Sequence, residues 1–78
     1  MITIAHFIAN IEEQFDDLEK GILKPESIFR DVFQWNSINA LIIIAMVKTE
    51  YNVVINAEDI RKSKTILDIF EIIQRKSQ

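Results

Sequence analysis

The only glycine and the only proline of this chain lie close together, at Gly21 and Pro25. Glycine and proline interrupt helices and strands more strongly than other residues, so the breaks in regular structure are concentrated in one segment. Nearly half of the 78 residues (49%) are hydrophobic, which excludes a disordered chain. This length and composition predict one domain, spanning residues 1–78, with a modest apolar core.

Composition excludes several kinds of site. The chain has no cysteine, which rules out disulfides, a thiol nucleophile and a cysteine-ligated zinc site. A single histidine, His6, rules out a histidine-rich metal centre, so we expect no bound metal. The formal net charge of -3 argues against a nucleic-acid partner, because binding to phosphates needs a basic surface.

Nothing in the sequence predicts export or membrane insertion. Residues 1–11 contain no basic residue and are therefore not a secretory signal. The longest apolar stretch, residues 40–47, is too short to cross a bilayer. We expect a soluble, cytoplasmic, monomeric protein.

Hydrophobic periodicity predicts a first helix that starts after the N-cap Thr3 and ends near residues 18–20, with Gly21 as the left-handed residue behind it. Its apolar side holds Ile4, Phe7, Ile8, Ile11, Phe15 and Leu18, and the acids of residues 12–19 form a solvated face. Residues 22–36 have no sustained period. They predict a long loop that is packed down by its own apolar side chains.

Three further helices follow this loop. Asn36 is a good N-cap residue, and we expect a helix that begins at Asn36 or Ser37 and runs to Tyr51. The body of this helix is apolar nearly all round, so it is central or exposes an apolar face to a partner. Asn56 with Asp59, and Thr65 with Asp68, are capping signatures for a short helix ending near residues 62–64 and for a last helix. The sequence predicts an all-α bundle of three main helices and one short helix, with the long loop between the first two.

This layout resembles the acyl and peptidyl carrier protein family over essentially the whole chain. The family carries its modified serine at the start of the second helix, commonly within an Asp-Ser-Leu triplet, and here Asn36-Ser37-Ile38 stands in that place, preceded by Trp35 as in some divergent carriers. Phe29 and Phe33 match apolar positions of the family's long loop, and Ile43, Ile44, Val47 and Tyr51 resemble its inward-facing positions. The family's pattern from helix three to helix four is matched by Ile60, Thr65, Ile66, Ile69 and Ile73. The resemblance implies a small acyl-carrier-like bundle.

The resemblance also implies that Ser37, with Asn36 as the cap beside it, carries a covalent 4′-phosphopantetheine arm taken from coenzyme A. The thiol of this arm would hold an acyl or aminoacyl group as a thioester. An exposed helix N-terminus suits the anionic phosphodiester, because free N–H groups and the helix dipole point at it. The chain itself is not expected to be an enzyme, since it offers no Ser-His-Asp constellation.

The implied partners are a phosphopantetheinyl transferase and enzymes that load or use the acyl group, docking near Trp35, Ile38 and Ile42. Ile38 and Ile42 share a helix face, although Ile42 is equally well explained as a core residue. The family's usual acid before the serine is replaced here by Asn36, and acids are scarce along the second helix. Two alternatives therefore stay open: a carrier-like fold without the arm that acts as a protein–protein adaptor through the apolar face of this helix, and an unrelated small helical regulator.

Overall fold

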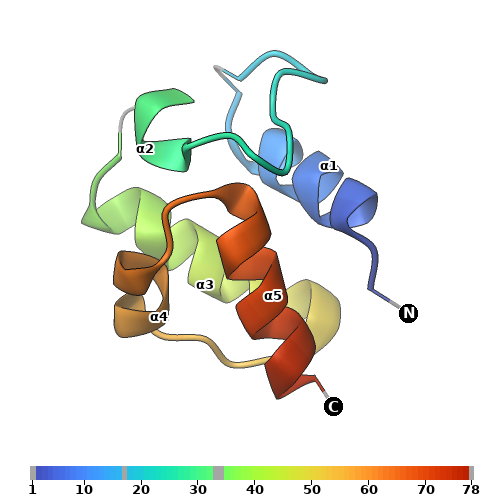
Figure 1. Ribbon diagram of the computed structural model, residues 1–78, viewed down its shortest axis with the longest axis vertical. Coiled ribbons are helices and arrows are strands. Elements are labelled where there is room, and N and C mark those ends of the chain that lie inside the picture. Colours follow the sequence, from blue (N-terminus) through green and yellow to red (C-terminus); the bar gives the residue numbers. More distant parts are fainter. Residues whose placement is uncertain (1, 17, 33–34, 78) are drawn as a thin grey trace.

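The computed structural model describes residues 2–16, 18–32 and 35–77 (Figure 1). This part of the chain is all helical apart from its connections, as predicted, and one isolated antiparallel bridge joins Ile28 to Thr65. Its helices are α1 (Ile4–Gln14), α2 (Phe29–Val32), α3 (Ser37–Tyr51), α4 (Ala57–Lys62) and α5 (Ile66–Lys76). They form a small bundle with extents of 31 × 24 × 21 Å.

The helices begin at the predicted caps. The side chain of Asn36 accepts a hydrogen bond from the backbone N–H of Asn39 at 2.9 Å, and Thr3 caps α1 in the same way. Complete capping boxes start α4, at Asn56, and α5, at Thr65. These side chains satisfy N–H groups that a helix leaves free in its first turn, which is why short polar residues fix the helix starts.

The end of the first helix differs from the prediction. Helix α1 stops at Gln14, because Phe15 turns into an extended conformation and is buried. The last turn of α1 has no basic residue, and the acids there oppose the helix dipole, so an extension to residues 18–20 would be poorly stabilised. Gly21 does have a positive φ of 87°, but it lies in the loop and does not end the helix.

Glu12 was expected on the solvated face of the first helix, yet it is only 8% exposed. Its carboxylate accepts hydrogen bonds from the backbone N–H of Gly21, at 2.9 and 3.0 Å to the two oxygens, and from that of Leu23 at 3.1 Å. The loop turns back over α1 at this point, which is what removes Glu12 from solvent. A carboxylate that receives backbone N–H groups is well stabilised without a cation beside it.

The connection between α1 and α3 is packed onto the bundle, as predicted. The carbonyl of Pro25 accepts from the N–H of Leu67 at 2.9 Å, and the carbonyl of Ser27 accepts from the N–H of Ile66 at 3.1 Å, so the loop covers the N-terminal end of α5 (Figure 1). Within the predicted loop lies the one-turn helix α2, whose Phe29 is fully buried. Phe33 lies outside the described residues.

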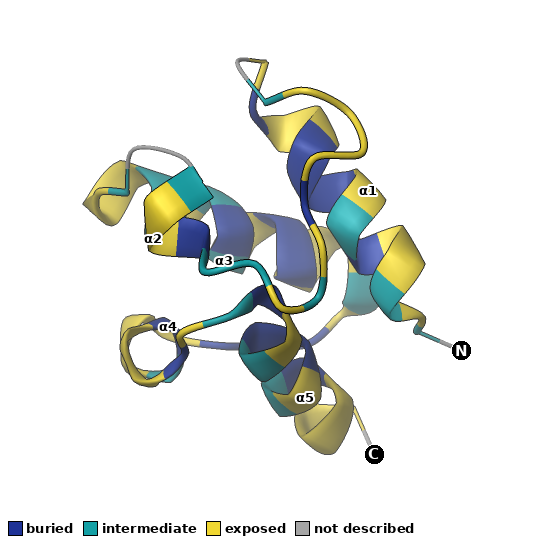
Figure 2. Ribbon diagram, turned by 45° about the horizontal axis from the view of Figure 1, so that its top comes forward, coloured by how far each residue is buried: buried dark blue, intermediate teal, exposed yellow. Residues whose placement is uncertain are grey.

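One core joins the helices. The three long helices each contribute several buried residues, and α2 and α4 each contribute one (Figure 2). The buried hydrophobic residues are Phe7, Ile11, Phe15, Leu23, Phe29, Ile43, Met46, Val47, Val53, Ile55, Ile60, Ile66, Ile69, Phe70 and Ile73. This core fixes α3 against α1 and α4, and so sets where the first residue of α3 lies.

Candidate functional site

Ser37 is the first residue of α3 and is exposed to solvent. Asn36 lies before it in an extended conformation and takes the N–H of Asn39, while no acid occupies the first turn of the helix. The positive end of the helix dipole is therefore open toward the Ser37 hydroxyl. The location predicted for Ser37 and Asn36, at the exposed head of this helix, agrees with the structure.

A surface pocket of about 300 Å³ opens beside the serine, and we call it the Ser37 pocket. Its walls come from α2, from the start of α3 and from α4, which are brought together only in the folded chain. The lining residues are Arg30, Trp35, Ser37, Ala40, Ala57, Ile60 and Arg61. Among the described residues, the lining of the pocket thus combines apolar side chains, a hydroxyl group and two arginines, and it includes no acid.

Arg30 holds one end of α4. Its guanidinium group donates to the carbonyl oxygen of Ser63 at 2.7 Å, of Ile60 at 3.2 Å and of Arg61 at 3.4 Å. Carbonyls at the end of a helix lack partners within it, so a cation that donates to them is a favourable cap. The same guanidinium carbon lies 4.5 Å from the ring centroid of Phe29, which adds a cation–π contact.

The indole of Trp35 extends this stack. Its ring centroid lies 4.7 Å from that of Phe29, in an edge-to-face arrangement that is favourable for aromatic pairs. Because Phe29 is buried in the core, the stack anchors both Trp35 and Arg30 to the bundle. This wall of the Ser37 pocket is therefore built on the core.

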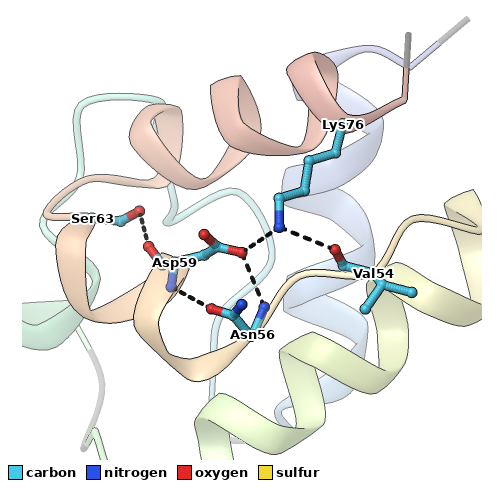
Figure 3. A network of polar contacts seen from close by, with 5 residues as sticks. All are labelled: Val54, Asn56, Asp59, Ser63 and Lys76. Atoms are coloured by element: carbon cyan, nitrogen blue, oxygen red, sulfur yellow. Dashed lines mark hydrogen bonds and ion pairs between the residues drawn. The ribbon is translucent and has the colours of Figure 1, made fainter.

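The other end of α4 is fixed by a polar network (Figure 3). The ammonium group of Lys76 lies 2.8 Å from the carboxylate of Asp59 and 3.3 Å from the carbonyl oxygen of Val54, and this carboxylate also accepts from the N–H of Asn56 at 3.1 Å. Burial acts to raise the pKa of Asp59, but these hydrogen bonds and the charge of Lys76 outweigh it, and the net pKa is lowered. Helix α4 is thus held at both ends before any ligand arrives.

The three side chains expected to dock partners differ in exposure. Ile38 is 66% exposed, whereas Trp35 and Ile42 are half-buried and pack against the core. Leu41 was not singled out in the sequence, yet it is 63% exposed and lies one turn from Ile38. Its spacing of three residues from Ile38 was the available signal, but α3 is apolar on nearly every side, so spacing alone did not separate its inner face from its outer one.

Ile42 instead borders a second pocket of about 300 Å³, between the end of α1 and the middle of α3. That pocket is lined by Gln14, Ile42, Ala45, Met46, Thr49 and Glu50. It lies on a different part of α3 from the Ser37 pocket, and no described residue lines both pockets.

Tyr51, Asn10 and His6 form a polar contact between α1 and α3. The hydroxyl oxygen of Tyr51 accepts from the Asn10 amide at 2.9 Å and lies 3.5 Å from Nδ1 of His6, and burial raises the pKa of Tyr51. Within the described ranges, no three histidine or acidic side chains are grouped so that they could hold a metal ion. No helix in the same ranges is long and apolar enough to cross a membrane.

No protein-family model matches the chain, and comparisons with curated proteins and with solved structures also gave no match.

Proposed function

We propose that this chain is an acyl carrier protein that holds an acyl or aminoacyl group as a thioester on a 4′-phosphopantetheine arm attached to Ser37. The observation that carries the proposal is the position of Ser37: it is exposed at the head of a 15-residue helix and borders a pocket with two arginines. An exposed serine could serve several functions, and the sequence resemblance to carrier proteins favours this one.

Attachment of the arm requires no catalytic group on the carrier itself. A phosphopantetheinyl transferase moves the arm from coenzyme A onto the Ser37 hydroxyl, so the carrier needs no base beside its serine. The phosphodiester that forms is an anion at a helix N-terminus, where free N–H groups and the helix dipole favour it. The partners of this proposal are the transferase and the enzymes that load or use the acyl group, and the protein acts as a monomer in the cytoplasm.

Intact-mass spectrometry tests the proposal. The purified chain is incubated with coenzyme A and a broad-specificity phosphopantetheinyl transferase, and a mass gain of one phosphopantetheine is expected. The gain should be absent from Ser37→Ala and present in Ser77→Ala, in which another exposed serine is removed. No gain with several transferases, or a gain that survives Ser37→Ala, would contradict the proposal.

The second candidate is a protein–protein adaptor without the arm. It is favoured by the exposure of Ile38 (66%) and Leu41 (63%), two large apolar side chains one turn apart on α3. An adaptor recovered from its native host would be unmodified at Ser37. Its function in that host would survive Ser37→Ala, but it would be lost in the double variant Ile38→Ser with Leu41→Ser. A carrier gives the opposite result at Ser37.

A further inference from the structure

The charge around the Ser37 pocket is opposite in sign to that of the whole molecule. The chain has a formal net charge of -3, yet the ionisable residues that line this pocket in the described part of the chain are both arginines. A cleft that is lined by charges of one sign raises the local concentration of ligands of the opposite sign. The pocket is therefore suited to an anion.

Arg30 brings a charge that no acid in the described part of the chain neutralises by an ion pair. Its three hydrogen bonds all go to backbone carbonyls. A guanidinium group has five N–H donors, so part of the fork stays available while Arg30 continues to cap α4.

Arg61 is committed only weakly. Its sole ion pair among the described residues joins it to Glu58 at 2.9 Å, one turn back on α4, and both side chains are exposed. Exposed pairs of this kind contribute little, because water and salt screen them. A phosphate in the pocket can therefore replace Glu58 as the partner of Arg61, because little free energy is lost when the exposed ion pair breaks.

The backbone brings the two arginines together, since Arg30 donates to the carbonyl oxygen of Arg61 itself. Trp35, Ala40 and Ile60 line the same pocket and supply apolar surface to it. This arrangement places two guanidinium groups, which can donate to phosphate oxygens, in the same pocket as an apolar surface that can contact the uncharged part of a ligand. Arginine is the residue best suited to such oxygens.

We propose that the Ser37 pocket is a phosphate-binding site, in which Arg30 and Arg61 hold the phosphate of a phosphate ester whose uncharged chain lies on Trp35, Ala40 and Ile60. The phosphate can be part of the arm on Ser37, in which case this inference rests on the function proposed above, or can belong to a free phosphate ester. The recognition chemistry is the same for both sources.

Titration of the unmodified chain by amide NMR tests the free source. 4′-Phosphopantetheine is compared with pantetheine, which has the same chain without the phosphate. We expect shifts concentrated at residues 35–40 and 57–61, and binding of pantetheine weaker by about tenfold, because pantetheine loses the contacts of both arginines with the phosphate. Equal binding of the two probes would overturn the inference for the free ligand.

A matched pair of variants assigns the site. Arg61→Gln should weaken binding of 4′-phosphopantetheine by about threefold, as expected for an exposed charge. Arg75→Gln removes an exposed arginine from the last turn of α5, outside the pocket, and should leave binding unchanged. Equal losses in both variants would mean that only the overall charge matters, which contradicts a built site.

The chain modified on Ser37 tests the covalent source. Phosphorus NMR of the arm should show a phosphodiester resonance whose chemical shift changes in Arg61→Gln but not in Arg75→Gln. Binding of the free ester by a chain that no transferase modifies would support the phosphate site and contradict the carrier function. The site would be overturned if the phosphorus chemical shift of the modified chain were unchanged in Arg61→Gln and the free ester did not bind. The carrier function would still stand in that case.

Discussion

A buried carboxylate, that of Glu12, ties the loop after α1 to the helix. It receives the N–H groups of Gly21 and Leu23, and the bond to Leu23 is buried. Glu12→Ala would leave a buried N–H without a partner, so we expect a loss of about 1–3 kcal/mol in the free energy of unfolding.

Denaturant unfolding of Glu12→Ala and Glu12→Gln measures this loss. The glutamine keeps one acceptor oxygen and should lose less stability than the alanine. Glu13→Ala, on the exposed side of the same helix, is the control and should remain within about 0.5 kcal/mol of the natural chain. An equal effect at Glu12 and Glu13 would show that the loop contact contributes nothing.

Gly21 gives a second prediction at the scale of one residue. A side chain added there would meet no atom within 4 Å, but the φ of 87° is unfavourable for any residue with a Cβ. Gly21→Ala should therefore lower the free energy of unfolding by about 1–2 kcal/mol through backbone strain alone. Chemical denaturation measures it, and a chain that is unchanged or stabilised would contradict this backbone conformation.

Local chemistry explains why some residues were predictable and others were not. Asn36, Asn56 and Thr65 act on N–H groups three residues away, so the sequence shows both partners. Glu12 bonds to residues in a loop that returns to it only after folding, and the sequence placed it wrongly in solvent. Nothing near it in sequence indicates that contact.

At the scale of an element, α3 has an inner and an outer face that its composition conceals. Ile43 is fully buried, whereas Ile38 on the same helix is 66% exposed. Ile43→Ala should lower the free energy of unfolding by about 2–5 kcal/mol, the usual range for emptying a core site. Ile38→Ala should change it by less than about 0.5 kcal/mol.

Thermal or denaturant unfolding of these two variants distinguishes the faces. Similar losses at both positions would mean that Ile38 is part of the core, and it could then not serve as a contact for partners. The pair also provides the folding control for any variant of the apolar face of α3.

The capping box of α5 makes the free energy of unfolding depend on pH in the acid range. The Asp68 carboxylate accepts from the N–H of Thr65 at 3.0 Å and of Lys64 at 2.9 Å, and these bonds lower the pKa of Asp68 below its ordinary value of 3.8. Because the folded-state pKa is the lower one, the stabilisation is present above pH 3.8 and is lost as the pH falls through the folded-state value.

Asp68→Asn should therefore be less stable than the natural chain at neutral pH, and the difference should shrink as the pH falls below about 4. Urea unfolding at a series of pH values measures it. A difference that is constant across the acid range would contradict the lowered pKa of Asp68.

At the scale of the whole molecule, the connection between α1 and α3 organises the site. It covers the N-terminal end of α5 with the carbonyls of Pro25 and Ser27, and its Arg30 reaches the end of α4. The all-α bundle was predictable because periodicity and caps are local signals. The Ser37 pocket was not, since it joins α2, α3 and α4 through contacts that are distant in sequence.

The account depends most on whether Ser37 carries the arm in the cell. The chain should be recovered from its native host and its intact mass recorded, with peptide fragmentation to locate any modification. We predict one phosphopantetheine, located at Ser37. A chain recovered entirely without it, while the host modifies its other carriers, would contradict the central claim.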